Sequence, residues 1–180
     1  MPEGDSVFQA CTRLHRALAG AVLERSDFRV PQLATADLSG YTVAQVVPRG
    51  KHLLMRFTPP QAGPPPLTLH SHLLMEGCWE LYAPGQRFTR PAHTIRVVLS
   101  TAQLSAVGFN IAQVRLLPTG EEHTLVGHLG PDLLGADWDA ERAVENLRAD
   151  PQRLIGQALL DQRIMAGIGN IYRSEILFLA

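Results

Sequence analysis

The sequence of 180 residues predicts an α+β protein, in which a leading helix is followed by a body of short strands and then by a helical unit. Three observations predict this order. Apolar residues recur at helical spacing near the amino end, short apolar runs bounded by turn residues fill the middle, and helix-capping residues return after residue 130. With 46% hydrophobic and 18% charged residues, the chain can bury a core.

Residues 5–19 form the expected leading helix. Asp5 or Ser6 is expected to cap its start, and Gly20 to end it. Four apolar residues recur at intervals of three or four and therefore share one buried face: Val7, Cys11, Leu14 and Leu18.

The middle of the chain, from about residue 21 to residue 117, has the pattern of strands. The proline-rich stretch 59–66 cannot join a sheet ladder, because proline lacks a backbone N–H, so we expect a surface loop there. Six apolar runs bounded by turn residues are the predicted strands: 42–47, 52–57, 67–74, 78–82, 94–99 and 114–117.

The remainder is expected to be helical. Asp137 is expected to cap a helix that runs to about Arg148, and a second helix is expected from Asp150-Pro151 to about Met165. Asn170 is expected to cap the last helix, over residues 171–179. That helix contains the end of the sequence, with apolar residues at 176–180, so we expect the sequence to be cut short. Three residues of the first of these helices are expected to point inward: Ala143, Val144 and Leu147.

Composition narrows the class of protein. No apolar run approaches the roughly 20 residues of a membrane-spanning helix, and the first residues are acidic where a signal peptide is basic. Cys11 and Cys78 lie far apart without a CxxC pair, which gives no zinc site and no disulfide framework. We therefore expect a cytoplasmic protein without a cofactor.

The net charge and its distribution along the chain give opposite indications about nucleic-acid binding. The net charge of −1 by itself argues against nucleic-acid binding, because such domains are usually basic. Eight of the seventeen acidic residues, however, lie within residues 121–150, so the rest of the chain is net basic. Fifteen of the sixteen basic residues are arginine, and Lys51 is the single lysine. A compact ammonium at that turn serves either as an ordinary solvated group or as a phosphate ligand.

The first residues could supply a nucleophile. Removal of Met1 before a small residue leaves Pro2 with a free secondary amine, which titrates near pH 8 and is partly unprotonated at neutral pH. Such an amine attacks a carbonyl carbon and forms an iminium, and Glu3 is the nearest acid or base by sequence. The alternative is that Met-Pro is a common start and that Glu3 only favours a helix N-terminus.

Two features of the predicted strands admit similar alternatives. His70 and His72 share one strand face, but no further ligand stands at zinc spacing, so they are expected to pack or to hydrogen-bond. Met75 lies at the tip of the turn that follows. An apolar tip either packs locally or fills the gap left by a base extruded from DNA.

The turn at residues 167–170 is rich in glycine. Its free backbone N–H groups, Gly169 among them, and the side chain of Asn170 suit an anion such as a DNA phosphate, with Arg163 and Arg173 at its flanks. The alternative is an ordinary turn between two helices.

Taken together, these motifs resemble the formamidopyrimidine-DNA glycosylase/endonuclease VIII family. The sequence as a whole looks most similar to the actinobacterial type of endonuclease VIII. The order and spacing of the motifs match over nearly all 180 residues. The last motif is specific to the family's helix–two-turn–helix element. Four segments carry the resemblance: Met1-Pro2-Glu3-Gly4-Asp5, Arg49-Gly50-Lys51, His72-Leu73-Leu74-Met75-Glu76-Gly77, and Leu159-Leu160-Asp161-Gln162 through Ala166-Gly167-Ile168-Gly169-Asn170 with Ile171-Tyr172.

The resemblance implies a base-excision repair enzyme that binds damaged double-stranded DNA. It implies an N-terminal catalytic β-sandwich domain with its leading helix at 1–118, a linker at 119–134, and a partial helix–two-turn–helix DNA-binding domain at 135–180. It also implies a bifunctional DNA glycosylase and AP lyase that works as a monomer, away from membranes, at the bacterial nucleoid.

By matching motif position, each implied role falls on one residue of this chain. Pro2 attacks C1′ of the damaged nucleotide, and Glu3 handles the proton at the sugar ring oxygen. Lys51 and Asn170 hold the flanking phosphates, while Met75 enters the duplex. The iminium acidifies the neighbouring carbon, so both phosphates leave by β,δ-elimination.

Two departures from the family pattern qualify what is implied. The stretch near residues 108–111 has no basic residue where the purine-oxidation branch fills the duplex, which favours oxidised pyrimidines as substrates. The family's four-cysteine zinc hairpin is not in this sequence, so zinc does not carry over.

Two alternative functions stay open. One is a truncated module that binds damaged DNA without turnover. The other is a small tautomerase that uses an N-terminal proline as a base, although there the proline starts a strand, whereas Pro2 here precedes a helix.

Overall fold

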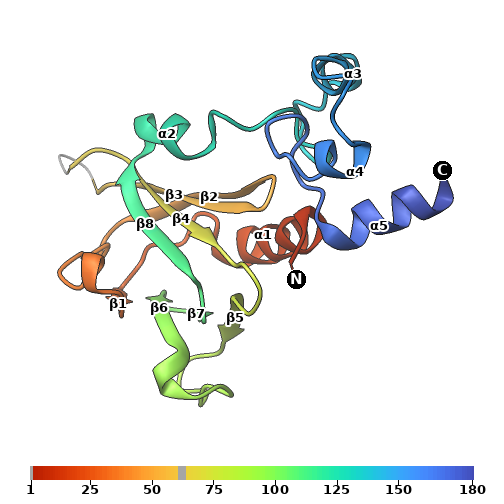
Figure 1. Ribbon diagram of the computed structural model, residues 1–180. Helices are drawn as coiled ribbons and strands as arrows, with labels where there is room; N and C mark the ends of the chain where they lie inside the picture. Colours follow the sequence, from red (N-terminus) through yellow and green to blue (C-terminus); the bar gives the residue numbers. More distant parts are fainter. Residues whose placement is uncertain (1, 61–63) are drawn as a thin grey trace.

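The computed structural model describes residues 2–60 and 64–180, and it has the expected order of a helix, a β body and a helical unit (Figure 1). Met1 and part of the expected proline-rich loop, residues 61–63, lie outside the described residues. The helices are α1 (Gly4–Leu18), α2 (His123–Val126), α3 (Ala140–Arg148), α4 (Ile155–Ala158) and α5 (Asn170–Leu179), with 3₁₀ turns η1 (Pro31–Leu33), η2 (Ala92–Thr94) and η3 (Thr119–Glu121). The strands are β1 (Arg25–Phe28), β2 (Thr42–Arg49), β3 (His52–Thr58), β4 (Leu67–His72), β5 (Cys78–Tyr82), β6 (Ile95–Ser100), β7 (Ser105–Phe109) and β8 (Gln113–Pro118).

Two antiparallel sheets share one core, which confirms the β-sandwich. One sheet has the strand order β2-β3-β4-β8 and the other β1-β6-β7-β5. Helix α1 lies against β2 and β3 (Figure 1). The core joins side chains of α1 to side chains of both sheets, among them Leu14, Leu53, Phe57, Trp79 and Leu99.

Helix α1 confirms the predicted apolar face but not the predicted cap. Val7, Cys11, Leu14 and Leu18 are all buried. The N-cap is Glu3, in extended backbone, rather than Asp5 or Ser6, and its side chain makes no capping bond within α1 because its carboxylate is bound elsewhere. Gly20 follows the helix end with a φ of 81°, a conformation that glycine adopts without strain.

Six predicted strands are confirmed to within a few residues, but β1 and β7 were not predicted. β1 is a short edge strand in which only Phe28 is buried, so it has no apolar run. β7 contains Gly108, which weakens a strand pattern. Because β7 ends at Phe109, the first part of the stretch 108–111 lies in a strand, and Phe109 is buried. β4 ends at His72 and not at residue 74, because Leu74 enters the following turn with a φ of 50°.

The helix predicted from Asp150-Pro151 to Met165 is wrong, because only α4 is helical there. Side chains compete with the helix for backbone groups. The Gln162 side-chain amide donates to the carbonyl of Leu160 at 2.9 Å and to that of Ile168 at 2.8 Å. Its oxygen accepts from the Gly167 N–H at 3.0 Å. These bonds hold the segment in turns.

Helix α3 also differs in detail from the prediction. Its cap is Asp139, whose side chain accepts from the Arg142 N–H at 2.9 Å, rather than Asp137. Ala143 is buried as predicted, but Val144 is 41% exposed. The helix therefore buries a narrower face than the apolar pattern indicated.

Three histidines meet on neighbouring strands. His52 Nδ1 lies 2.8 Å from His70 Nε2, and the ring of His72 packs edge-on against His52. Burial, which disfavours the charged imidazole, lowers the pKa of His52 to about 3 and that of His70 to about 4, and it also lowers the pKa of His72. Within residues 2–60 and 64–180, no group of His, Cys, Asp and Glu is arranged to hold a metal ion, and no helix has the length and apolarity to cross a membrane.

The lowered pKa values in this cluster predict that the folded state loses stability in acid. His52 and His70 bind protons more weakly in the folded than in the unfolded chain, so their contribution to stability is fully present above about pH 6.5 and is lost as the pH falls toward 4. We expect unfolding between these pH values to take up nearly two extra protons. Urea denaturation at a series of pH values measures this uptake.

Replacing both residues by phenylalanine removes the two ionisable rings and should flatten the part of the pH dependence that they cause, while His72, whose pKa is also lowered, keeps its own part. His93→Phe, at an exposed position, is the matched control and should leave the pH dependence unchanged. An unaltered slope in the double variant would contradict the assignment.

Candidate active site

The carboxylate of Glu3 joins the amino-terminal segment to the start of α5. Glu3 is 2% exposed. Its Oε2 accepts from the Gly169 N–H at 2.9 Å and from the Tyr172 N–H at 3.2 Å, and its Oε1 accepts from the Ile171 N–H at 2.7 Å. These N–H groups belong to the start of α5, where backbone donors lack helical partners and the helix dipole favours negative charge. Glu3 therefore caps α5 from outside that helix.

The backbone approaches closely at the same point. The Gly4 N–H donates to the Gly167 carbonyl at 2.9 Å, and a Cβ added at Gly4 would lie 2.8 Å from the Gly167 Cα. A Cβ at Gly169 would lie 2.4 Å from the Glu3 carboxyl carbon. A side chain at Gly4 or Gly169 would overlap these neighbouring atoms, so both positions favour glycine.

This arrangement corrects two predictions about the glycine-rich turn. The N-cap of α5 is Gly169 rather than Asn170, and the N–H of Gly169 is bound to Glu3, so it is not free for a phosphate. The side chain of Asn170 is exposed, and no hydrogen bond to it is found within the described part of the chain. Its predicted role as a phosphate ligand stays a prediction.

The flanking arginines differ from each other. The Arg163 guanidinium donates to both carboxylate oxygens of Asp161, at 2.9 and 2.6 Å, and its charge holds the pKa of that carboxyl well below its usual range. Arg163 is therefore paired, although its side chain remains 70% exposed. Arg173 is half-buried on α5, and its guanidinium donates to the hydroxyl oxygen of Ser174.

Lys51 lies in the turn between β2 and β3. Gly50 makes that turn with a φ of 57°. Lys51 is half-buried, which lowers the pKa of its ammonium, while the negative charge of Glu3 acts in the opposite direction. The negative charge of Glu3 thus acts on the ammonium of the single lysine.

A buried carboxylate holds the Lys51 turn in place, and sequence reasoning missed it. Asp132 is 3% exposed, and its Oδ2 accepts from the Gly50 N–H at 2.6 Å while its Oδ1 accepts from the Leu134 N–H at 3.1 Å. Beside it, Arg49 donates to the Gly130 carbonyl at 3.0 Å and pairs with Asp137 at 3.0 Å. No sequence pattern pointed to Asp132, because its partner at Gly50 lies 82 residues away.

Pro2 lines a hollow next to the segment that carries Met75. Pro2 is half-buried, and the opposite wall of this hollow includes Leu73 and Gly77 from the segment between β4 and β5. Met75, at the tip of that segment, is 64% exposed. Met75 thus projects from the surface as an apolar tip, which is the placement that the sequence predicted.

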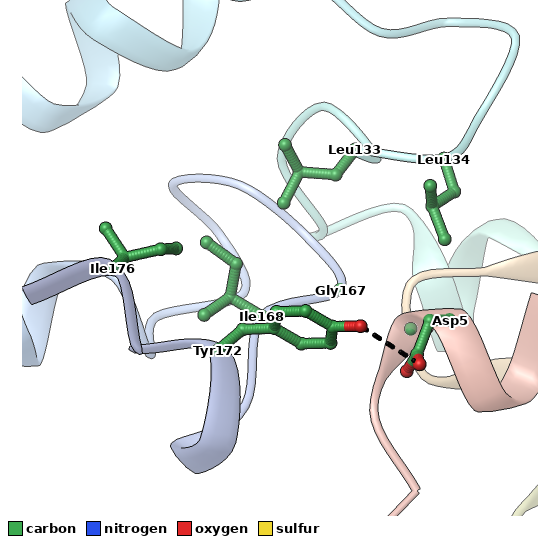
Figure 2. Close-up of a pocket in the computed structure, with 8 residues that line it drawn as sticks. Asp5, Leu133, Leu134, Gly167, Ile168, Tyr172 and Ile176 are labelled. Atoms are coloured by element: carbon green, nitrogen blue, oxygen red, sulfur yellow. Dashed lines mark hydrogen bonds between the residues drawn. The ribbon is translucent and has the colours of Figure 1, made fainter. Parts of the chain in front are cut away.

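A separate apolar cavity lies between the start of α1 and α5 (Figure 2). Its volume is about 210 Å³, and Leu133, Leu134, Ile168 and Ile176 are among its lining residues. At one side the Tyr172 hydroxyl donates to Asp5 Oδ2 at 3.1 Å, and this bond to a carboxylate raises the pKa of Tyr172. Pro2, Glu3 and Lys51 are not among the residues that line this cavity.

Asp132 provides a test of this geometry. Asp132→Ala leaves the buried Gly50 N–H without an acceptor, which we expect to cost about 1–3 kcal/mol of unfolding free energy. Asp137→Ala, in the same segment, removes a carboxylate that is 61% exposed and should cost less than about 1 kcal/mol. Urea denaturation compares the two, and equal losses would contradict the role given to Asp132.

Comparisons with known proteins match nearly the whole chain to one family. The family model for the formamidopyrimidine-DNA glycosylase N-terminal domain matches residues 1–116, and the model for the H2TH domain of the same glycosylase matches residues 129–180. The predicted domain boundaries at 118 and 135 themselves stay predictions.

Two curated relatives are similar over almost the whole chain. A probable endonuclease 8 2 from Streptomyces coelicolor is 62% identical over 180 residues, which cover 99% of this chain and 63% of the relative. A protein named DNA-(apurinic or apyrimidinic site) lyase Nei2 from Mycolicibacterium smegmatis is 48% identical over 178 residues, which cover 99% of this chain and 66% of the relative. The chain thus spans about two thirds of the length of these relatives.

A solved structure shares the fold. The wild-type Lactococcus lactis Fpg (MutM), in complex with DNA that contains an N7-benzyl-Fapy-dG, matches with a TM-score of 0.79 and 25% identity. The match covers 99% of this chain and 67% of that one. The predicted resemblance is confirmed by fold and by sequence, and the chain belongs to the formamidopyrimidine-DNA glycosylase family.

Proposed function

We propose that this chain carries the catalytic machinery of a bifunctional DNA glycosylase and AP lyase that acts in base-excision repair on damaged double-stranded DNA. One observation carries the proposal. The chain's amino end is fixed at the junction of the sandwich and α5, where the Glu3 carboxylate and the Lys51 ammonium act on each other. An amine, a carboxylate and a fixed cation are the groups that Schiff-base chemistry at a phosphate-linked sugar needs.

In the proposed first step, the Pro2 nitrogen uses its lone pair to attack C1′ of the damaged nucleotide. The bond from C1′ to the base breaks, and its electron pair leaves with the base. The attack leaves a proton on the positively charged Pro2 nitrogen, and the Glu3 carboxylate takes up that proton. The nitrogen lone pair then forms the iminium as the bond from C1′ to the ring oxygen opens, and Glu3 passes the proton to that oxygen. Oε1 of Glu3 accepts only one backbone hydrogen bond, so a lone pair on it stays available to carry this proton.

The resulting iminium withdraws electrons from the neighbouring carbon. Loss of a proton from C2′ expels the 3′ phosphate, and a second elimination expels the 5′ phosphate. Lys51 holds one flanking phosphate as a compact charge, and Asn170 donates to another with its free amide. Gly169 contributes by holding Glu3, while Arg163 and Arg173 add positive charge at the margin of the DNA site.

We assign the substrate as an oxidised pyrimidine. The link from β7 to β8, residues 110–112, carries no basic residue, and Ile111 within it is 2% exposed. This link offers little that could replace a large extruded purine, whereas the exposed Met75 can fill the gap. We further propose that the protein works as a monomer in the bacterial cytoplasm, at the nucleoid and without a membrane partner. No cofactor is assigned to these residues.

Covalent trapping tests the proposal. Borohydride reduces an iminium to a stable amine, so the full-length native gene product should form a covalent adduct with a duplex that contains thymine glycol or an abasic site. Mass spectrometry should place the adduct on Pro2 as the first residue. An uncleaved extension before Pro2 turns the amine into an amide, keeps every side chain, and should reduce trapping at least about a hundredfold.

No adduct from a protein with Pro2 confirmed as its first residue would refute the proposal. Gel-shift binding to damaged duplex in the absence of any adduct would favour the alternative of a binding module without turnover.

A further inference from the structure

Strand β8 is an outermost strand of its sheet, and it leads through η3 into α2 (Figure 1). A groove of about 630 Å³ lies beside it, and every residue from 112 to 117 lines this groove. One wall is formed by Val30 and Leu33 at η1, and another by Thr124 and Leu125 of α2. The groove therefore borders the edge of a strand, between two short helical segments.

The hydrogen-bond pattern shows which backbone groups of β8 face the groove. In an antiparallel pair, successive residues alternate between bonding to the neighbouring strand and turning their N–H and C=O groups away from it. The Thr119 N–H donates to the Pro66 carbonyl at 2.9 Å, which continues the register between β4 and β8. Counted back from Thr119 in steps of two, the odd-numbered residues of β8 bond to β4. Val114 and Leu116 therefore turn their N–H and C=O groups outward.

The edges of the other outermost strands are covered by contacts within the chain. At β2, the Val43 N–H donates to the Ala21 carbonyl at 2.9 Å, and the Val46 N–H donates to His15 Nδ1 at 3.1 Å. A loop and a helix side chain thus occupy the outer edge of this strand.

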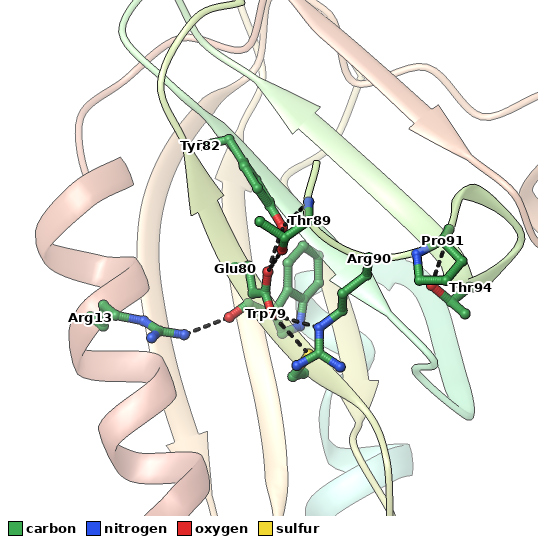
Figure 3. A network of polar contacts seen from close by, with 9 residues as sticks. Arg13, Trp79, Glu80, Tyr82, Thr89, Arg90, Pro91 and Thr94 are labelled. Carbon is green, nitrogen blue, oxygen red and sulfur yellow. Dashed lines mark hydrogen bonds and ion pairs between the residues drawn. The ribbon is translucent and has the colours of Figure 1, made fainter. Parts of the chain in front are cut away.

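The second sheet is covered in the same way at both of its edges. At β5, the Arg13 guanidinium reaches across from α1 and donates to the Trp79 carbonyl (Figure 3). At β1, the Ser26 hydroxyl oxygen accepts from the Leu38 N–H at 2.8 Å. In the part of the chain that the structure describes, no such contact is made by the outward N–H groups of β8. An open edge of this kind is a template for a further strand.

The side chains along β8 would meet such a strand on two faces. Because side chains alternate along a strand, Val114 and Leu116 lie on one face, and Arg115 and Leu117 lie on the other. Val114, Leu116 and Leu33 pack against the sandwich core and are only half-buried. They offer an apolar surface to every second residue of an added strand.

Arg115 gives the middle of the groove a positive charge. Its side chain is exposed, it lies opposite the neutral ring of His70 on β4, and no ion pair of it is found among the described residues. From residue 81 to residue 120 the sequence contains four arginines and no acidic residue. Glu121, which also lines the groove, lies beyond the end of β8. An acidic residue opposite Arg115 would complete a cross-strand pair of opposite charge.

We propose that the edge of β8 is a docking site for an extended segment of a partner protein, which adds to the sheet as a fifth strand. The segment alternates apolar with polar residues and carries an acidic residue opposite Arg115. Its backbone bonds to the outward groups of Val114 and Leu116, and its apolar side chains cover Leu33. The groove shares no lining residue with the hollow of Pro2, so docking goes beyond the proposed reaction and does not depend on it.

Two capped synthetic peptides test this edge in the full-length gene product. In each peptide, about eight residues long, valine alternates with threonine. One central threonine is replaced by aspartate in the first peptide and by lysine in the second. Hydrogen exchange followed by NMR reports on the N–H groups of Val114 and Leu116. We expect the aspartate peptide to slow exchange at both positions, and the lysine peptide to bind about tenfold more weakly.

Arg115→Glu reverses the charge at an exposed position and should reverse the preference, so that the lysine peptide binds more tightly than the aspartate peptide. Arg87→Glu is the matched control, because it makes the same change at an exposed position outside the groove, and it should keep the preference for aspartate. Urea denaturation checks that both variants are folded.

Unchanged exchange at Val114 and Leu116 with both peptides, or an unreversed preference in Arg115→Glu, would overturn the proposal. The aspartate peptide with N-methyl groups on alternate residues cannot form the backbone bonds on the methylated edge, so equal binding of a peptide methylated on either edge would also overturn it. Protection that grows with protein concentration in the absence of peptide would assign the edge to a second copy of the chain instead. None of these results alters the outcome of covalent trapping, which tests the proposed function separately.

Discussion

The structure depends on one interaction, the binding of the Glu3 carboxylate to backbone N–H groups at the start of α5. Glu3 and Gly169 are far apart in sequence, yet a buried charge and three of the donors that a helix start leaves without partners satisfy each other. An unpaired carboxylate at this depth would be costly, so the two segments stabilise each other's positions. The amine proposed as the nucleophile belongs to the residue before Glu3. The same contact therefore sets where the reaction takes place.

The other parts of the site are arranged around this contact. Asp132 holds the turn at Gly50, and so places Lys51 within the electrostatic reach of Glu3. Gly4 allows the two backbones to approach where a Cβ would lie 2.8 Å from the Gly167 Cα, and Gly167 has a φ of 113°, which favours glycine. Backbone N–H groups and the carboxylates of Glu3 and Asp132 make these contacts. The side chains of Lys51 and Asn170 therefore remain available to a polyanion.

Sequence patterns predicted the parts of this structure that depend on local chemistry. The apolar face of α1 and most strands follow from periodicity, and the exposed tip at Met75 follows from its turn. Long-range contacts were not predictable in this way. Glu3 was a candidate acid or base by proximity to Pro2, but its binding to α5 requires residues that only the fold brings together. The wrong cap at Asn170 has this origin, because the Glu3 side chain binds the Gly169 N–H. The wrong helix before Met165 has a local origin, because the Gln162 side chain binds the carbonyls of Leu160 and Ile168 and holds the segment in turns.

Hydrogen exchange at the first turn of α5 tests the central contact most directly. The N–H groups of Gly169, Ile171 and Tyr172 have no helical acceptor, so they are protected from exchange only if Glu3 binds them. We expect slow exchange at all three in the intact protein. In Glu3→Gln we expect protection to be reduced at these positions and unchanged in the sandwich core, for example at Leu53. Equal protection in both proteins, or fast exchange at the three positions in the intact protein, would contradict the account.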